Sequence, residues 1–223
     1  MNTRIGSTVY LGVGVVFNFY RPTFPCLHQD TCKVKTVGDG SGTSDAELQI
    51  AVKYYPFYPK PTVVTSSLRV QSDGKILGTG SGYFNADQNN SNKNTAAIFN
   101  VEGGAIDFSN KYMLWTAGTT ATKVESVNIS DGGHVHAGDV RFGTLGDGPV
   151  FVDTDADTVA DAWNLTLNFL SEGTFTAAYN AADSGGFDDL AAVNAGITAD
   201  WITVAEGYEL VVTENIGVDF TIT

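Results

Sequence analysis

Apolar and polar residues alternate along most of this chain, starting near its amino terminus. From Val9 to Phe19 every odd position is apolar, and the even positions include two glycines and an asparagine. A period of two is typical of a β-strand with one buried face. The same pattern returns between Ile216 and Ile222. A strand at each end of the chain offers edges that can pair with another molecule, so we expect assembly.

Similar alternation predicts many further strands. The candidate strands cover residues 46–54, 68–77, 96–101, 106–116, 123–129, 140–145, 163–169, 175–179 and 202–212. Asp73-Gly74, between two apolar runs, is a strong hairpin signal. Helix signals are confined to residues 187–194, with Asp188 and Asp189 at the start and Gly196 as the expected end. We see no repeat of fixed period, which argues against a solenoid.

Many short strands joined by glycine-rich turns indicate an all-β protein. We predict an antiparallel β-sandwich of the jelly-roll type, with about 8–11 strands and at most one short helix near residues 187–194. Residues 1–20 form an N-terminal strand, and residues 21–223 form a single β-sandwich domain. Whether that strand folds into its own subunit or is exchanged with a neighbouring one stays open.

Charge is distributed unevenly. Residues 1–130 contain 11 Lys and Arg against 9 Asp and Glu, whereas residues 131–223 contain 1 against 16, so the net charges are +2 and −15. The shortage of basic residues argues against a nucleic-acid partner, because phosphate binding needs clustered Lys and Arg. The acidic half is expected to bind cations, to favour solubility in salt, or to meet the less acidic half of a neighbouring copy.

Composition indicates where such a protein works. Charged residues make up 17% of the chain, and Gly, Thr, Asn and Ser fill their place. This composition is common in extracellular and virion β-proteins, so we expect one of these locations. No apolar run approaches the roughly 18 residues of a membrane span.

Two cysteines, Cys26 and Cys32, enclose a short loop that contains His28. A disulfide across this loop would stabilise the fold by about 2 kcal/mol in the chain-entropy model. Free thiols, or a metal ion held by both cysteines and His28, are the alternatives. We favour the disulfide.

Four aspartates at short spacing form the sharpest local motif: Asp153, Asp155, Asp157 and Asp161. Carboxylates at alternating positions can surround one hard cation. The segment resembles the calcium loops of EF-hands and of thrombospondin-type and dockerin-type modules, which implies calcium as a candidate cofactor. It departs from these loops at Thr158, where they have glycine, and at Asn164, where they have glutamate. An acidic surface turn is the alternative.

Two histidines, His134 and His136, lie between glycines. Residues two apart in a strand face the same way, so both imidazoles could ligate one metal ion. The alternative, which we favour here, is a pair of exposed polar residues at a strand edge.

An aromatic, proline-rich segment follows the strand predicted over residues 46–54. Its aromatic residues are Tyr54, Tyr55, Phe57 and Tyr58. Proline keeps such a segment extended. We expect either a contact loop whose aromatic rings anchor a partner or a sugar, or a loop that covers the end of the sandwich.

We expect no enzyme, because the chain has no Gly-x-Ser-x-Gly elbow and its histidines lack the context of a catalytic triad. We therefore expect a structural subunit that self-assembles into a virion shell (capsid) or an extracellular filament through strand pairing between subunits. Its partners are copies of itself and other structural proteins of the assembly. The expected subunit contacts are Val9, Leu11, Val13, Val15, Phe17 and Phe19. The alternative is a calcium-assisted module that binds carbohydrate or a surface. An enzyme on a β-sandwich, such as a cupin or a hydrolase of polysaccharides, is a further alternative.

Overall fold

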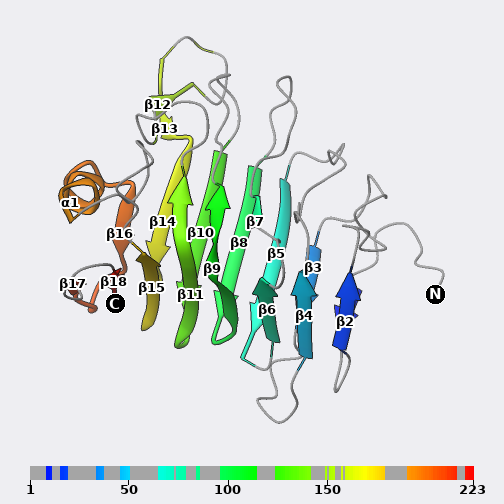
Figure 1. Cartoon of the computed structure of the whole chain (residues 1–223). Helices are drawn as coiled ribbons and strands as arrows, with labels where there is room; N and C mark the ends of the chain where they lie inside the picture. Colours follow the sequence, from blue (N-terminus) through cyan, green and yellow to red (C-terminus); the bar gives the residue numbers. More distant parts are fainter. Residues whose placement is uncertain are drawn as a thin grey trace.

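The computed structural model describes only part of the chain. The described residues are 9–11, 16–19, 34–37, 46–50, 65–72, 74–78, 84–85, 96–114, 124–141, 149, 151–153, 157, 159–178, 190–214 and 219–223. Strands dominate these residues (Figure 1).

Two large β-sheets make up the body of the molecule. Sheet A consists, in spatial order, of β1 (Val9–Leu11), β3 (Val34–Val37), β5 (Thr65–Gln71), β8 (Ala96–Glu102), β10 (Val124–Ser130), β14 (Leu165–Phe169) and β16 (Ile202–Val204). Sheet B consists of β17 (Val212–Glu214), β18 (Asp219–Ile222), β15 (Gly173–Ala178), β11 (Gly133–Arg141), β9 (Ala105–Leu114), β6 (Gly74–Gly78), β4 (Ala46–Ile50) and β2 (Val16–Phe19), with β7 (Phe84–Asn85) also paired to β9. A small third sheet pairs β12 (Phe151–Val152) with β13 (Ala162–Trp163), and α1 spans Leu190–Thr198.

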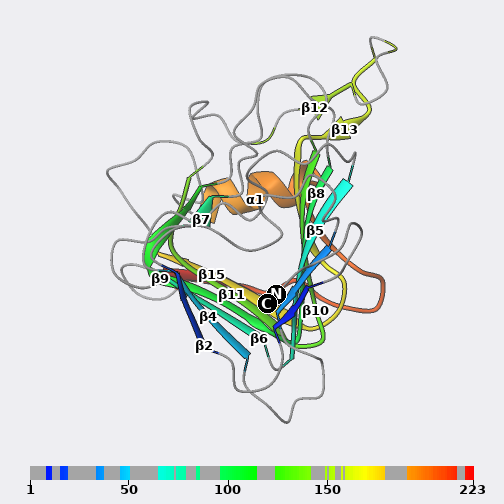
Figure 2. The ribbon, with the colours of Figure 1, turned by 90° about the vertical axis from the view of Figure 1, so that its right-hand side faces the viewer.

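The chain passes back and forth between the two sheets, because β8 lies in sheet A, β9 in sheet B, β10 in sheet A and β11 in sheet B. Residues that pair between neighbouring strands lie far apart along the sequence. Val9 and Lys35 are 26 positions apart, and Glu125 and Leu165 are 40 positions apart. Each coil thus stacks on the previous one, which is the arrangement of a parallel β-solenoid. Figure 2 looks along this stack and shows the two sheets converging on one side. α1 lies at the carboxyl-terminal end of the stack, next to β16 (Figure 1).

The predicted antiparallel jelly-roll sandwich is therefore wrong. Every pairing in sheet A is parallel, and sheet B is parallel except where β18 pairs with β15 and β17. Alternation has a period of two in parallel and antiparallel strands alike, so the pattern did not distinguish them. The predicted hairpin at Asp73-Gly74 is also wrong, because β5 and β6 on either side of it belong to different sheets.

The predicted single strand at the amino end is two strands. β1 pairs in parallel with β3 of sheet A, and β2 pairs in parallel with β4 of sheet B, both within the same chain. Alternation continues across the boundary between them, so the sequence did not reveal the change of sheet. At the other end of the chain, β18 lies between β15 and β17 and does not form an edge.

Two other predicted elements differ in detail. The short helix is confirmed as α1, but Gly196, its expected end, lies inside it. A Cβ atom at Gly196 would lie 2.6 Å from Cζ2 of Trp201, so glycine here allows the helix to pack closely. The predicted strand 163–169 is divided at the buried Asn164: Trp163 belongs to β13, whereas β14 begins at Leu165.

Apolar side chains fill the space between the two sheets in stacked rows. In sheet A the register aligns the buried residues Leu68, Phe99, Val127, Leu167 and Ile202. In sheet B it aligns Ile76, Ile106, Val135, Phe175 and Ile222. Burying each such side chain contributes about 1.5–3 kcal/mol. The predicted inward-facing positions of 163–169 are confirmed at Leu165, Leu167 and Phe169.

Glycines form a column at the tight corner where the chain leaves sheet A for sheet B. The register pairs Gly133 with Gly173. Ala105 pairs with Lys75 on one side and with His134 on the other. Gly104, one residue earlier, therefore lies beside Gly74 and Gly133. A Cβ atom at Gly133 would lie 2.2 Å from the carbonyl oxygen of Val101. Successive coils come too close here for any side chain, so glycine keeps the corner tight.

Candidate functional site

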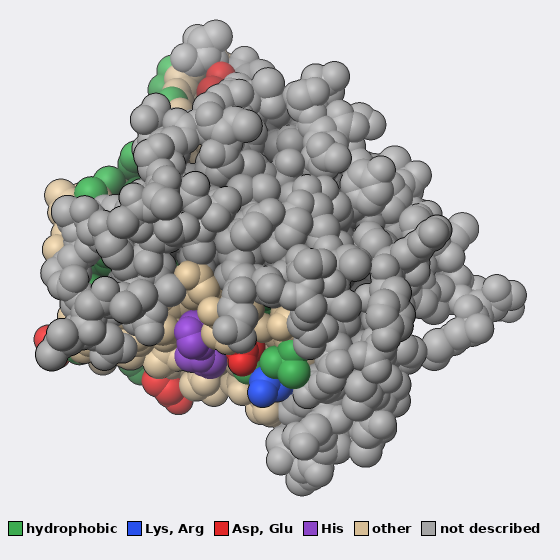
Figure 3. Space-filling view, viewed as in Figure 1, with side chains coloured by type: hydrophobic (Ala, Val, Ile, Leu, Met, Phe, Trp, Pro, Cys, Tyr) green, Lys and Arg blue, Asp and Glu red, His purple; other side chains and the backbone are tan. Residues whose placement is uncertain are grey.

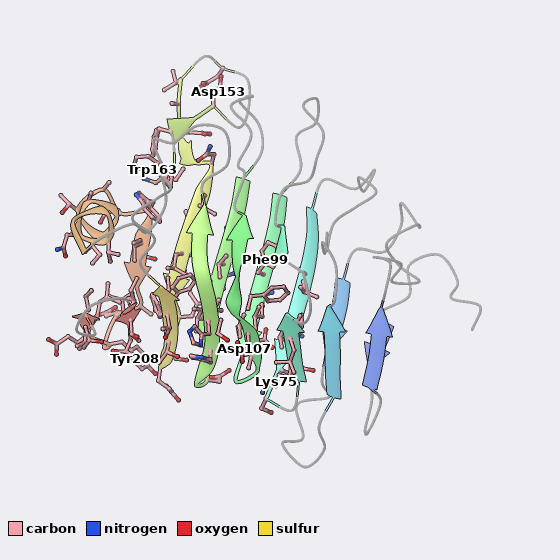
Figure 4. The ribbon with its side chains drawn as sticks, in the orientation of Figure 1. Lys75, Phe99, Asp107, Asp153, Trp163 and Tyr208 are labelled. Atoms are coloured by element: carbon pink, nitrogen blue, oxygen red, sulfur yellow. The ribbon has the colours of Figure 1, made fainter. Side chains whose placement is uncertain are left out.

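The outer face of sheet B carries a cluster of ionisable side chains near its centre. Because the side chain of Val135 is fully buried, its neighbours His134 and His136 face outward from β11. Their purple side chains lie beside acidic and basic residues in Figure 3. Figure 4 labels Asp107 and Lys75, which come from β9 and β6 of the preceding coils. We call His134, His136, Asp107 and Thr174 the histidine cluster.

Strand register determines which residues of this cluster are neighbours. His134 lies between Ala105 and Thr174, and His136 lies between Asp107 and Thr176. The Nδ1 atom of His134 makes a hydrogen bond with the hydroxyl of Thr174. The centroids of the two imidazole rings are 5.9 Å apart, with an angle of 69° between the ring planes.

The surroundings set the charge of these groups. Burial raises the pKa of Asp107, but hydrogen bonds from Ser109 and the nearby charges of His136 and Lys75 outweigh burial and lower it overall. The backbone N–H of Ser109 donates to Asp107 Oδ1 at 3.0 Å. Burial lowers the pKa of His134, and the charges of His136 and Lys75 lower it further. The negative charge of Asp107 acts in the opposite direction but does not outweigh them. At neutral pH the cluster therefore presents an unprotonated imidazole beside an ionised carboxylate.

The outer face of sheet A carries a different feature, a ladder of hydrogen-bonded amides. Asn128 donates through Nδ2 to Asn100 Oδ1 at 2.9 Å, and Asn168 donates through Nδ2 to Asn128 Oδ1 at 2.9 Å. Thr203 extends the ladder by donating its hydroxyl to Asn168 Oδ1 at 2.8 Å. We call Asn100, Asn128, Asn168 and Thr203 the asparagine ladder. Its side chains satisfy one another from coil to coil, so it acts as a structural brace along the stack.

The aspartates predicted to bind calcium belong to the segment that connects β12 to β13. Asp153 directly follows β12, Asp161 directly precedes β13, and Asp155 lies outside the described residues. Asp157 Oδ1 accepts a hydrogen bond from the backbone N–H of Val159 at 2.8 Å. Phe151 and Trp163 pack edge to face at the base of this segment, with ring centroids 5.0 Å apart. Within the described part of the chain, no group of three His, Cys, Asp or Glu residues is arranged to hold a metal ion.

The predicted subunit contacts lie at one end of the solenoid. Val9 and Leu11 belong to β1, and Phe17 and Phe19 belong to β2, which are the last strands of sheets A and B. The remaining predicted contacts, disulfide and aromatic residues lie outside the described residues: Val13, Val15, Cys26, Cys32, Tyr54, Tyr55, Phe57 and Tyr58.

Sequence reasoning paired His134 with His136 but missed Asp107, Thr174 and the asparagine ladder. Asp107 and Thr174 come from neighbouring coils, and the hydrogen bond between Thr174 and His134 spans 40 positions. The ladder did leave a trace, because each of its asparagines lies between two apolar residues of a strand, as in Phe99-Asn100-Val101.

None of the helices among the described residues is long and apolar enough to cross a membrane. Comparison of the chain with protein-family models, with curated proteins and with solved structures finds no match.

Proposed function

We propose that this protein is a structural subunit that assembles with copies of itself, as the building block of a virion shell or an extracellular filament. The observation that carries the proposal is the position of β1 and β2. Among the described strands, β1 hydrogen-bonds only to β3, and β2 only to β4. The outer backbone groups of such edge strands readily pair with a strand from another chain.

The opposite end of the solenoid is less suited to this contact. The edge strand β16 packs against α1, and sheet B ends in the antiparallel pair of β18 and β17. Residues 131–223 also carry a net charge of −15, so two carboxyl-terminal ends repel each other. A contact between copies therefore uses the amino-terminal end of at least one subunit.

Mass measurement of the full chain in solution, by light scattering after size-exclusion chromatography, tests this proposal. Asn18 lies on β2, and a lysine there opposes edge pairing because its charge must be desolvated at the contact. We expect assemblies larger than the 23.6 kDa chain for the natural sequence and a smaller average mass for N18K. The matched control N194K also replaces an asparagine by lysine, at an exposed position on α1, and should leave the average mass unchanged. A natural chain that is monomeric at all concentrations, or equal masses for N18K and the natural chain, contradicts the proposal.

One observation favours calcium-assisted binding as a second candidate function. The segment 51–64, which contains the aromatic residues Tyr54–Tyr58, connects the end of β4 to the start of β5. The segment 142–164, which contains the aspartates, connects the end of β11 to the start of β14. Because β4 and β11 run parallel within sheet B, both connections leave from the same end of the coils, as binding loops of solenoids often do.

Thermal melting with and without added CaCl₂ tests this second function. D157N removes one charge but keeps an oxygen that accepts from the Val159 N–H. We expect calcium to raise the melting temperature of the natural chain and to raise that of D157N less. The control D200N removes a charge from an exposed position outside the motif and should respond like the natural chain. Equal calcium shifts in all three proteins, or no shift in any, contradict this function.

A further inference from the structure

We infer that His134 and His136 chelate one borderline divalent transition-metal ion, of the class of Zn²⁺ and Cu²⁺, on the outer face of sheet B. This inference does not depend on the proposed assembly. Imidazole nitrogen is a preferred ligand of both ions.

The backbone holds the two imidazoles in a fixed relationship. β11 is an interior strand, paired with β9 on one side and β15 on the other. Val135, between the histidines, is fully buried in the core. The two side chains therefore leave the same face of a rigid strand, and their ring centroids are 5.9 Å apart. A fixed backbone of this kind lowers the entropic cost of bringing two ligands to one ion.

Thr174 provides a second, independent observation. Its hydroxyl makes a hydrogen bond with Nδ1 of His134, so Nε2 is left to offer its lone pair to solvent when Nδ1 is the donor. Histidines that bind metals usually donate their other ring N–H to an oxygen in this way, which fixes the tautomer and the ring orientation. Thr174 is thus a positioning residue for His134.

Neighbouring residues shape the local charge. Ala105, the partner of His134 on β9, has a small side chain, and the carboxylate of Asp107 lies beside His136 in register. The negative charge of Asp107 favours a bound cation, whereas the positive charge of Lys75 opposes it.

The protein supplies two ligands in this arrangement. In the proposed site, water molecules complete the coordination of the ion. A site of this kind is open and exchangeable, in contrast to the closed four-ligand sites of structural zinc.

Isothermal titration of the full chain with ZnCl₂ at neutral pH tests the inference. We expect the natural chain to bind Zn²⁺, and H134Q and H136Q each to weaken binding by at least about tenfold. D200N is the control, because it changes an exposed residue outside every proposed metal site and should leave the affinity unchanged. Thermal melts of the variants show that each of them folds. Absence of Zn²⁺ binding, or affinities for H134Q and H136Q equal to that of the natural chain, overturns the inference.

Two further variants separate chelation from a general attraction of cations. T174V should weaken Zn²⁺ binding by about tenfold while both imidazoles stay in the coordination sphere. Electron paramagnetic resonance with Cu²⁺ counts the nitrogen ligands, and we expect two in the natural chain and in T174V but one in H136Q. K75Q should strengthen binding, because it removes an opposing charge. A Cu²⁺ spectrum that is the same in H136Q and the natural chain overturns the inference.

Discussion

Asn128 joins three successive coils of the solenoid through its side-chain amide, donating to Asn100 Oδ1 at 2.9 Å and accepting from Asn168 Nδ2 at 2.9 Å. The three asparagines are in register on β8, β10 and β14. The hydrogen bonds of the ladder require the three strands to keep this register. The ladder therefore stabilises the register of sheet A as well as the fold.

Removing the central amide of the ladder should destabilise the protein. Asn128→Ala eliminates two hydrogen bonds between half-buried side chains, each with a net contribution of about 0.5–1.5 kcal/mol. We expect the free energy of unfolding, measured with urea, to fall by about 1–3 kcal/mol. Asn194→Ala, at an exposed position on α1, is the control and should change it little. A similar loss in the two variants would show that the ladder contributes nothing specific.

Adjacent glycines at the corner should respond very differently to alanine. In Gly133→Ala the new Cβ meets the carbonyl oxygen of Val101 at 2.2 Å, and neither backbone can move without shifting a coil. In Gly132→Ala the Cβ meets nothing within 4 Å, and the cost is the left-handed backbone with a φ of 77°. We expect a loss of about 1–2 kcal/mol for Gly132→Ala and a larger loss for Gly133→Ala. Chemical denaturation checks the order, and the reverse order contradicts the close stacking of coils at this corner.

Acid should destabilise the fold through His134. Its pKa in the folded protein is lowered from 6.5, mainly by burial, so the unfolded chain takes up a proton at a higher pH than the folded chain does. The contribution of His134 to the free energy of unfolding is complete above pH 6.5, its pKa in the unfolded chain. This contribution is lost as the pH falls through the lower pKa of His134 in the folded protein. We expect the free energy of unfolding to decrease as the pH falls below 6.5, and to decrease less in H134Q. The same pH dependence in both proteins contradicts this role of His134.

The sequence predicted where strands occur better than how they pair. Alternation identified the inward-facing residues of β14, such as Leu167 and Phe169, because burial of one face has the same period in any sheet. Pairing was not predictable from alternation, since the partners of β10 lie 28 and 40 positions away along the chain. The segments that connect a strand of sheet B to the next strand of sheet A differ in length, and this difference concealed the repeat.

A repeat signal was nevertheless present in the sequence. Gly74, Gly104, Gly133 and Gly173 each stand two positions before a core residue of sheet B, at intervals of 30, 29 and 40 residues. Reading these glycines as one stacked corner would have indicated a solenoid. The same limit applies to the histidine cluster: the shared face of His134 and His136 follows from local spacing, but Asp107 and Thr174 join them only through strand register.

Hydrogen exchange of the backbone amides in β2 tests the central claim, assembly through the amino-terminal edge, most directly. If a second copy pairs with this edge, protection of the amides of Val16–Phe19 should rise with protein concentration. Protection of Val135, in the interior of sheet B, should stay constant. If a sample contains assemblies but the exchange rates of the amides in β1 and β2 do not depend on protein concentration, the account is contradicted.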